Sequence, residues 1–214
     1  MRFIYFNARG LGETSRLLLA YLGVDYTDFR YPLEVIDFKT HNMVKVEFDE
    51  AKKNGDLLKS LNKLPYLELD DGTIIPQSKS IERYIAKKFK VYGTTLEEEG
   101  KIDAICECIR DYKDLYKKAK ISDNKESELN NFFSVVLPER LNLLENLLGN
   151  DYSVGGIFSL ADMVIYSFVK EFFDDKESVI KAISKLEKIK SIVERISGNE
   201  KINKWLETRP VTAF

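Results

Sequence analysis

Few side chains in this chain of 214 residues could carry nucleophilic or metal chemistry. Its two cysteines, Cys106 and Cys108, stand two residues apart in a segment with helical periodicity, where they would point about 200° away from each other. This spacing makes them poor disulfide partners and supplies no metal-ligand set. The single histidine, His41, leaves little material for a histidine-based metal site or a catalytic triad. These counts remove several classes of enzyme, and no metal is expected.

One tyrosine has a position that suits chemistry. Tyr5 lies in the short apolar segment RFIYF, directly before a turn through Asn7 and Gly10 that leads into a leucine-rich segment. A phenol with a pKa near 10 keeps its proton at neutral pH and can donate a hydrogen bond. An aromatic residue in a strand more often packs in a core. The end of a strand before a helix N-terminus also suits a ligand contact, so both interpretations are open from this segment alone.

The elements that would position this tyrosine follow from the hydrophobic pattern. RFIYF reads as a strand, GETSRLLLAYLG as a helix that ends at Gly23, and DYTDFRY as a second strand. One irregular helix is expected in the polar stretch of residues 32–60. PYLELDDGTIIP then predicts a hairpin, and QSKSIERYIAKKF predicts a helix with a serine at its start. The expected order is βαβ, a helix, and then ββα.

After about residue 90 the pattern becomes almost wholly helical. Helices are expected near residues 96–120 and 126–148, with Pro138 interrupting the second, and shorter helices follow. In the segment FSLADM, Ser159 and Asp162 have the spacing of a capping box. The change of pattern predicts two domains, residues 1–90 and 91–214.

Composition excludes several classes of partner. With 33 Lys and Arg against 35 Asp and Glu, the formal net charge is −2, which gives no argument for nucleic acid or an anionic membrane. No apolar run approaches the roughly 20 residues that a spanning helix needs. Met1 leads directly into the first strand without a signal-peptide pattern, so a cytoplasmic protein is expected.

Four pieces of the chain, in one order, carry a family resemblance. They are YFNARGLGETSR, the Leu-Pro of NKLPYLE, PQSKSIERYIAKKF, and the SLAD box of the helical half. Together they resemble a cytosolic glutathione transferase, nearest to the sigma class and to parasite-type and prostaglandin D synthase-type members. The resemblance implies a thioredoxin-like domain that binds glutathione, followed by an all-helical domain that contributes the electrophile pocket. It also implies glutathione as co-substrate, a homodimer and a role in detoxification.

The resemblance assigns roles to individual residues. Tyr5 matches the tyrosine whose hydroxyl donates a hydrogen bond to the glutathione sulfur. Gln77 and Ser78 match the pair that holds the γ-glutamyl carboxylate. Leu64 precedes Pro65 at the position where the family has a cis bond and where the backbone pairs with the cysteinyl amide.

Other matches concern the remaining charged groups of glutathione. Phe48 and Lys52 in FDEAK have the spacing of a sigma-class tryptophan and of the lysine that meets the glycyl carboxylate. Lys45, Lys53 and Lys63 are alternatives for that lysine. Asp111 matches an acid that reaches the glutathione amino group across the dimer. Arg110 stands where some members have an acid, which disfavours a metal-linked isomerase.

The leading hypothesis is conjugation of the glutathione thiolate to small hydrophobic electrophiles. A non-catalytic carrier of haem or another hydrophobic ligand, or a structural member of the fold, is the alternative. Glutathione-dependent isomerisation or peroxide reduction would use the same thiol. Arg9, Glu13 and Arg16 are expected to be structural or interface residues, and Arg9 could also support the thiolate.

Overall fold

The computed structural model describes residues 1–37 and 42–212, so His41 lies outside the described residues. Contacts between Cα atoms divide the chain into two compact units. The first contains Met1–Ile85 together with Lys204–Phe214, and the second contains Ala86–Asn203. The domain boundary after residue 90 stays a prediction, and the residues from Lys204 onward group with the first unit rather than with the helices before them.

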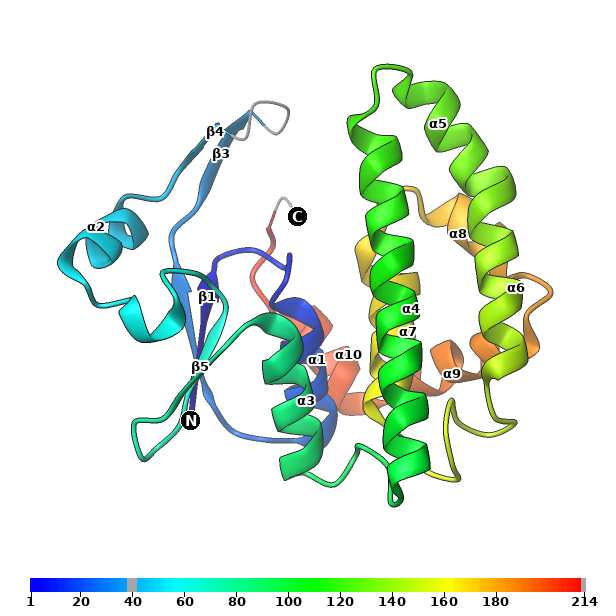
Figure 1. Ribbon diagram of the computed structural model, residues 1–214, viewed down its shortest axis with the longest axis horizontal. Coiled ribbons are helices and arrows are strands. Elements are labelled where there is room, and N and C mark those ends of the chain that lie inside the picture. The colour runs from blue at the N-terminus through cyan, green and yellow to red at the C-terminus, as the bar shows by residue number, and fades with distance from the viewer. Residues whose placement is uncertain (38–41, 213–214) are drawn as a thin grey trace. The chain divides into compact units, whose positions relative to one another are not determined.

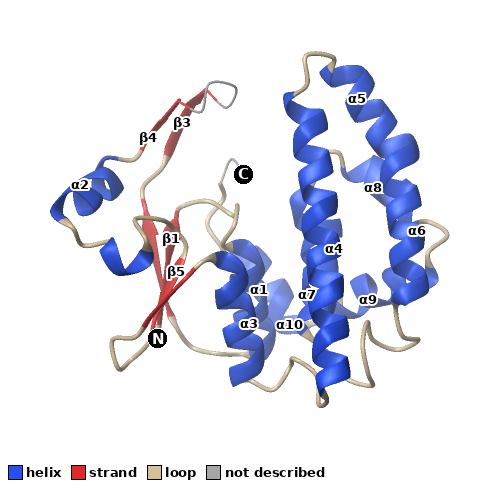
Figure 2. Ribbon diagram, in the orientation of Figure 1, coloured by secondary structure: helices blue, strands red, loops and turns tan. Residues whose placement is uncertain are grey.

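A four-stranded mixed sheet forms the centre of the first unit (Figure 2). Its strands lie in the order β2-β1-β5-β6, with β1 parallel to β2 and the other pairs antiparallel. The bounds are β1 Arg2–Phe6, β2 Thr27–Tyr31, β5 Tyr66–Glu68 and β6 Ile74–Pro76. This confirms the thioredoxin-like order of a βαβ unit followed by ββα, because α1 (Glu13–Leu22) joins β1 to β2 and α3 (Ser78–Lys88) follows β6.

Helices cover the two faces of this sheet. Figure 1 shows α1 and α3 on one side of the strands and α2 (Val46–Asn54) on the other. Side chains of β1 alternate between these faces, as the strand period of two requires. Phe3 and Tyr5 point towards the start of α1, whereas Phe6 meets the ring of Phe48 on α2. The C-terminal part of β1 therefore directs the Tyr5 side chain towards the face of the sheet that α1 covers.

A short hairpin is the main departure from the expected elements. The sequence pattern predicted only an irregular helix in residues 32–60, but the antiparallel pair β3 (Glu34–Asp37) and β4 (Asn42–Val44) precedes α2 there. A 3₁₀ turn, η1 (Leu58–Ser60), follows α2. The two strands are only four and three residues long, which is too short for a clear alternating pattern within a polar stretch.

The second unit is helical, which confirms the expected all-α domain. Its central helix α7 has all eight residues buried and packs against α4 and α9. The bounds are α4 Leu96–Ile121, α5 Lys125–Asn131, α6 Leu137–Leu147, α7 Leu160–Ser167, α8 Lys176–Ile183, α9 Glu187–Ser197 and α10 Glu200–Thr208, with α10 running on into the first unit. The capping box at the start of α7 is present: the Asp162 carboxylate accepts the Ser159 backbone N–H at 2.8 Å.

Two wide helical turns interrupt this unit. The π-helical segment η2 (Phe132–Val136) lies directly before Pro138, and a second one, η3 (Phe168–Phe172), follows α7. Pro138 has no N–H to offer to the carbonyl of Ser134, and a π turn is one way in which a helix absorbs such a missing bond. The interruption that the sequence predicted at Pro138 takes this form.

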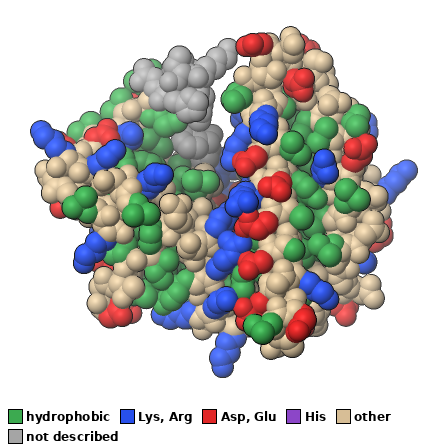
Figure 3. Space-filling model, in the orientation of Figure 1, with side chains coloured by type: hydrophobic (Ala, Val, Ile, Leu, Met, Phe, Trp, Pro, Cys, Tyr) green, Lys and Arg blue, Asp and Glu red, His purple; other side chains and the backbone are tan. Residues whose placement is uncertain are grey.

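Surface charge agrees with the balanced composition. Figure 3 shows acidic and basic side chains interspersed over the visible face of the helical unit. Within the described residues, no helix combines the length and the apolar character that crossing a bilayer requires.

Candidate functional site

Tyr5 sits in a narrow slot beside the turn that follows β1. Its side chain is buried, with 7% of the residue exposed. A Cβ atom at Gly12 would lie 2.7 Å from the ring carbon Cδ1, and a Cβ at Gly10 would lie 2.7 Å from the hydroxyl oxygen. Gly10 also has a φ of +36°, which side chains disfavour. The two glycines let the backbone approach the phenol closely, and thereby fix where it lies.

The hydroxyl of Tyr5 is itself a hydrogen-bond acceptor. The backbone N–H of Leu11 donates to it at 3.1 Å, and among the described residues this is its one hydrogen bond. Burial raises the pKa of Tyr5 above its ordinary value, while the Leu11 N–H and the charge of Arg16 act in the opposite direction. The phenol therefore keeps its proton at neutral pH. Because the oxygen accepts from Leu11, its own proton can be donated to another group.

Arg16 holds the backbone next to Tyr5. Its guanidinium is fully buried and donates from Nη1 to the carbonyl of Ala8 at 2.6 Å and from Nη2 to the carbonyl of Phe6 at 3.4 Å. The same group lies 5.7 Å from the centroid of the Tyr5 ring, and its Nε donates to Asp28 at 3.1 Å. Arg16 thus ties the turn after β1 to α1 and to β2.

A buried carboxylate continues this network to the C-terminal segment. One oxygen of Glu13 accepts from the indole N–H of Trp205 at 3.0 Å and from Arg209 at 2.7 Å. The other lies 3.7 Å from Nη1 of Arg16. These partners are almost 200 residues apart in the chain, so the sequence could not indicate them.

Arg16, like Arg9 and Glu13, was expected to be a structural or interface residue, and support of the thiolate was considered only for Arg9. A signal for a buried pair was present, since Glu13 and Arg16 are one helical turn apart and four apolar residues follow them.

Strand pairing brings three of the predicted positions to one end of the sheet. Ile4 pairs with Tyr66 and Tyr66 pairs with Pro76, so continuing both registers by one residue sets Tyr5, Pro65 and Gln77 in one row. The peptide bond between Leu64 and Pro65 is cis, as the family resemblance implied. Ser78 follows Gln77 as the first residue of α3. Tyr5, Leu64, Pro65, Gln77 and Ser78 therefore lie at the same end of the sheet, the carboxyl end of β1.

Gln77 has a backbone conformation that few residues adopt. Its φ is +72°, in the left-handed region, and its side chain is exposed. Such a conformation costs about 1 kcal/mol for a residue with a side chain and is often found where function requires it. Together with Ser78, it leads into the N-terminus of α3, where backbone N–H groups and the helix dipole favour an anion.

The two residues assigned from α2 have different surroundings. Phe48 is buried, and its ring packs edge to face against Phe6 at 5.1 Å and Tyr31 at 6.0 Å between centroids. It fills the core beneath α2. Lys52 is exposed, and so are the alternatives Lys53 and Lys63. Lys45 lies with its ammonium 5.2 Å from the centroid of the Phe48 ring.

Asp111 belongs to the helical unit, where it is exposed on α4. Its neighbour Arg110 forms an ion pair with Glu107 at 2.7 Å. Within residues 1–37 and 42–212, no cluster of three or more His, Cys, Asp or Glu side chains could hold a metal ion.

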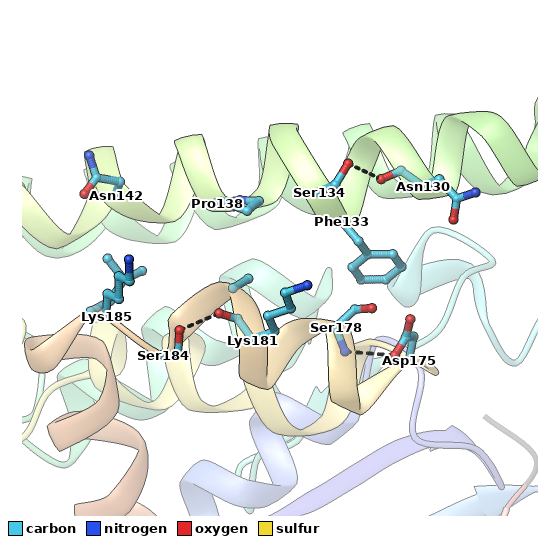
Figure 4. A pocket seen from close by; sticks show the side chains of 12 residues that line it. Asn130, Phe133, Ser134, Pro138, Asn142, Asp175, Ser178, Lys181, Ser184 and Lys185 are labelled. Carbon is cyan, nitrogen blue, oxygen red and sulfur yellow. Dashed lines mark hydrogen bonds between the residues drawn. The ribbon is translucent and has the colours of Figure 1, made fainter.

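The helical unit also has a groove, lined by polar and apolar side chains, that contains none of these residues. It has a volume of about 740 Å³ and lies between the α5–α6 run and α8. Figure 4 shows Lys181 and Ser178 of α8 facing Phe133 and Pro138 across it.

Comparisons with known proteins place this geometry in a family. Residues 1–87 match the family described as Glutathione S-transferase, N-terminal domain, and residues 110–209 match Glutathione S-transferase, C-terminal domain. Probable glutathione S-transferase 7 of Caenorhabditis elegans is 27% identical over 219 residues, which cover 98% of this chain and 97% of that relative.

Two other relatives bear different names. S-crystallin SL11 of Nototodarus sloanii is 30% identical over 220 residues, covering 98% of this chain and 97% of the relative. Hematopoietic prostaglandin D synthase of Gallus gallus is 29% identical over 222 residues, covering 100% and 98%.

A solved structure extends the match to the fold. Monomeric Na-GST-3, a glutathione S-transferase of Necator americanus, has a TM-score of 0.80 and 25% identity, with 100% of this chain and 98% of that chain covered. With both family domains matched in order and relatives of 27% to 30% identity matched over at least 97% of their length, the chain belongs to the glutathione S-transferase family and is a glutathione transferase.

Proposed function

We propose that this chain conjugates glutathione to small hydrophobic electrophiles and that the hydroxyl of Tyr5 stabilises the glutathione thiolate. The observation that carries the proposal is the Tyr5 hydroxyl, which accepts from the Leu11 N–H and keeps a proton to donate. It lies at the end of the sheet that also holds the cis Leu64–Pro65 bond and the start of α3.

The chemical benefit follows from thiol ionisation. A free thiol with a pKa near 8.5 is only a few per cent thiolate at neutral pH, and the thiolate is the nucleophile. A hydrogen bond that favours the charged sulfur by about 2.7 kcal/mol lowers the pKa by roughly two units. With an activated aryl chloride, the sulfur forms a bond to the ring carbon, chloride leaves, and the thiol proton is released to solvent when the thiolate forms.

The ends of glutathione would be held by groups on different elements. We assign the γ-glutamyl carboxylate to Gln77, Ser78 and the N-terminus of α3, where an anion is favoured. The backbone of Leu64 would pair with the cysteinyl amide. For the glycyl carboxylate the candidates are Lys52 and, as alternatives, Lys45, Lys53 and Lys63. Lys45 has its ammonium against the Phe48 ring, and the other three are exposed.

Asp111 would contact glutathione only in a homodimer. There its carboxylate would meet the amino group of the glutathione that is bound to the other subunit. The homodimer and the cytoplasmic location stay predictions. Light scattering after size exclusion tests the homodimer, with twice the chain mass of 24.8 kDa expected.

The experiment that tests the function is an ultraviolet titration of the enzyme-bound thiolate. Wild type is compared with Tyr5→Phe, and with Tyr152→Phe as a matched control outside the first unit. Turnover of an activated aryl chloride is followed in parallel. A bound thiol that ionises well below its free pKa in wild type and in Tyr152→Phe, but not in Tyr5→Phe, supports the proposal. Equal pKa values in all three would refute thiol activation by Tyr5.

A second candidate is glutathione-dependent isomerisation, since one relative is named as a prostaglandin D synthase. It needs the same thiolate, so it differs only in the second substrate. Turnover of a prostaglandin endoperoxide without turnover of the aryl chloride would favour it. Absence of both activities with retained binding of a hydrophobic ligand would favour a carrier or structural role.

A further inference from the structure

One buried carboxylate ties the C-terminal helix α10 to the start of α1. Glu13 is the first residue of α1, and only 3% of it is exposed. Its Oε1 accepts from the indole N–H of Trp205 at 3.0 Å and from Nη1 of Arg209 at 2.7 Å. All three residues belong to the first compact unit. The C-terminal segment therefore joins this unit through a charged contact that is closed to solvent.

The contacts of Glu13 continue into a closed ring. Arg16 follows one helical turn later, and its Nη1 lies 3.7 Å from the second oxygen of Glu13. Nε of Arg16 donates to one oxygen of Asp28 at 3.1 Å, and Nε of Arg30 donates to the other at 2.8 Å. The Arg30 guanidinium lies 6.0 Å from the centroid of the Trp205 ring, at the outer limit of a cation–π contact. The ring therefore joins α1, β2 and α10.

Two members of this ring act on the backbone that holds Tyr5. Arg16 donates to two carbonyls of the segment around the end of β1, at 2.6 and 3.4 Å. Only Gly12 separates Glu13 from Leu11, whose N–H donates to the Tyr5 hydroxyl at 3.1 Å. A displacement of Glu13 therefore displaces the donor that Tyr5 accepts.

The turn before α1 has little local means of fixing its own position. Its N-cap residue is Gly12, which has no side chain to cap the helix. Gly10 and Gly12 also restrict the backbone less than other residues would. Contacts from outside the turn, those of Glu13 and Arg16, therefore contribute to where the Leu11 N–H lies.

The competing explanation is that the ring only stabilises the fold. Buried charge networks do stabilise folds when their members are complete. However, α10 already has an apolar anchor in Ile202, which is fully buried. Burial of a carboxylate costs free energy that a second apolar contact would not. Its place beside the turn that holds Tyr5 favours a role in the site.

From these contacts we infer that Trp205 and Arg209 are positioning residues of the Tyr5 site. They hold the carboxylate of Glu13, and Glu13 and Arg16 fix the turn that follows β1. That turn in turn places the N–H that the Tyr5 hydroxyl accepts. The C-terminal segment thus completes the site in which the thiolate is stabilised. The inference rests on the proposed function and deepens it.

The experiment combines loss of the C-terminal contacts with loss of the hydroxyl. The double variant Trp205→Phe/Arg209→Met removes both donors to Glu13 and keeps an aromatic ring and an apolar stem. The pKa of the bound glutathione thiol and kcat/KM for an activated aryl chloride are measured with and without Tyr5→Phe. When Tyr5 is present, the double variant should lower kcat/KM by at least about tenfold and raise the thiol pKa towards its free value. In the Tyr5→Phe background the same two changes should alter kcat/KM by less than about twofold, because their effect acts through the hydroxyl.

Arg195→Met is the charge-matched control. Arg195 lies in the second unit, donates to the carbonyl of Asp151, and has its guanidinium 4.3 Å from the centroid of the Tyr152 ring. Its replacement removes one positive charge, as Arg209→Met does, and leaves the contacts of Glu13 intact. The change in kcat/KM should stay below about twofold.

Spectra of ¹³C-labelled tyrosine and ¹⁵N-labelled leucine report the geometry without turnover. The Tyr5 ring signal and the Leu11 amide signal should move in the double variant and keep their wild-type positions in Arg195→Met. Trp205→Phe alone retains the Arg209 donor and should give smaller shifts in the same direction. This single variant carries the test if circular dichroism shows that the double variant does not fold.

Three results would overturn the inference. They are a folded variant with wild-type kcat/KM, an equal loss with and without the Tyr5 hydroxyl, and Tyr5 and Leu11 signals that do not move. An equal loss in both backgrounds would show that the ring only stabilises the fold. A wild-type thiol pKa in Tyr5→Phe would instead refute the proposed function, and the two signals would still show whether the C-terminal segment positions the turn.

Discussion

The backbone N–H of Leu11 donates to the hydroxyl oxygen of Tyr5 across 3.1 Å. The turn that follows β1 therefore holds the phenol from one side and leaves its proton for a ligand. The same turn is packed so closely on the tyrosine ring that only glycine fits at residues 10 and 12. The position and the hydrogen bonding of this side chain are thus decided by a few residues of the adjacent backbone.

Replacement of Gly12 by alanine should displace Tyr5. The new Cβ would lie 2.7 Å from the tyrosine ring, so the ring or the turn must move. Because catalysis is sensitive to a displacement of about 1 Å, we expect kcat/KM to fall by about 10²-fold. The pKa of the bound glutathione thiol should rise towards its free value. Turnover kinetics and the thiolate titration measure the two effects.

Gly100→Ala is the matched control for this experiment. Gly100 lies in α4, and a Cβ there would meet nothing within 4 Å. Activity should be unchanged, and the free energy of unfolding should increase by about 1 kcal/mol because alanine is the better helix former. Unchanged kcat/KM in Gly12→Ala would show that the slot around Tyr5 is not needed.

The pH dependence of activity should contain no loss that originates in Tyr5 up to about pH 10. Burial raises the pKa of this phenol above its ordinary value of 10.0, so the donor is present below that pH and is lost only as the pH rises through the raised value. The profile of kcat/KM should therefore rise as the glutathione thiol ionises and then remain level through pH 9. Spectra of ¹³C-labelled tyrosine follow the Tyr5 signal directly. A Tyr5 signal that titrates below pH 10 would contradict this prediction.

Replacement of Gln77 by glycine should separate stability from binding. Glycine adopts the φ of +72° without strain, which offsets the entropy that it adds to the unfolded chain. The free energy of unfolding should then stay within about 1 kcal/mol of wild type. The KM for glutathione should rise about tenfold or more, because the amide that is proposed to meet the γ-glutamyl carboxylate is lost.

Urea unfolding and steady-state kinetics measure both quantities for Gln77→Gly. Asn62 offers a control, since its φ of +55° is also left-handed and it lies outside the proposed contacts. Asn62→Gly should leave the KM unchanged. A wild-type KM in Gln77→Gly would remove Gln77 from the glutathione site.

Replacement of Arg16 by methionine should affect both the fold and the site. Arg16 is fully buried, and its loss leaves the carbonyls of Ala8 and Phe6 without its N–H donors and removes one of the charged partners of Glu13 and of Asp28. Removing one member of a buried charge network typically costs about 3–5 kcal/mol of unfolding free energy. Urea unfolding measures this cost.

Arg2→Met is the matched control, because the side chain of Arg2 is 43% exposed and its ion pair with Glu68 is long, at 3.7 Å. Its cost should stay below about 1 kcal/mol. In the folded fraction of Arg16→Met, kcat/KM should fall while Arg2→Met retains it. Equal stability of the two variants would show that the Arg16 network is not needed for the fold.

The sequence by itself determined most of the order of elements and indicated candidate positions for glutathione binding. Strand and helix periods predicted the βαβ and ββα halves, because those segments have clear apolar patterns and glycine or proline boundaries. The family resemblance of its motifs assigned Tyr5 and the Gln77–Ser78 pair to glutathione binding. The short hairpin β3–β4 was missed, since strands of four and three residues in a polar stretch have too little pattern to detect.

Only the tertiary structure decided which of these residues meet. Strand register sets Tyr5, Pro65 and Gln77 in one row, and register depends on pairing between segments about 60 and 70 residues apart. The link from Glu13 to Trp205 and Arg209 joins the two ends of the chain. The groove between the α5–α6 run and α8 also needs helical segments from different parts of the chain packed together, because a single segment shows only an ordinary amphipathic pattern.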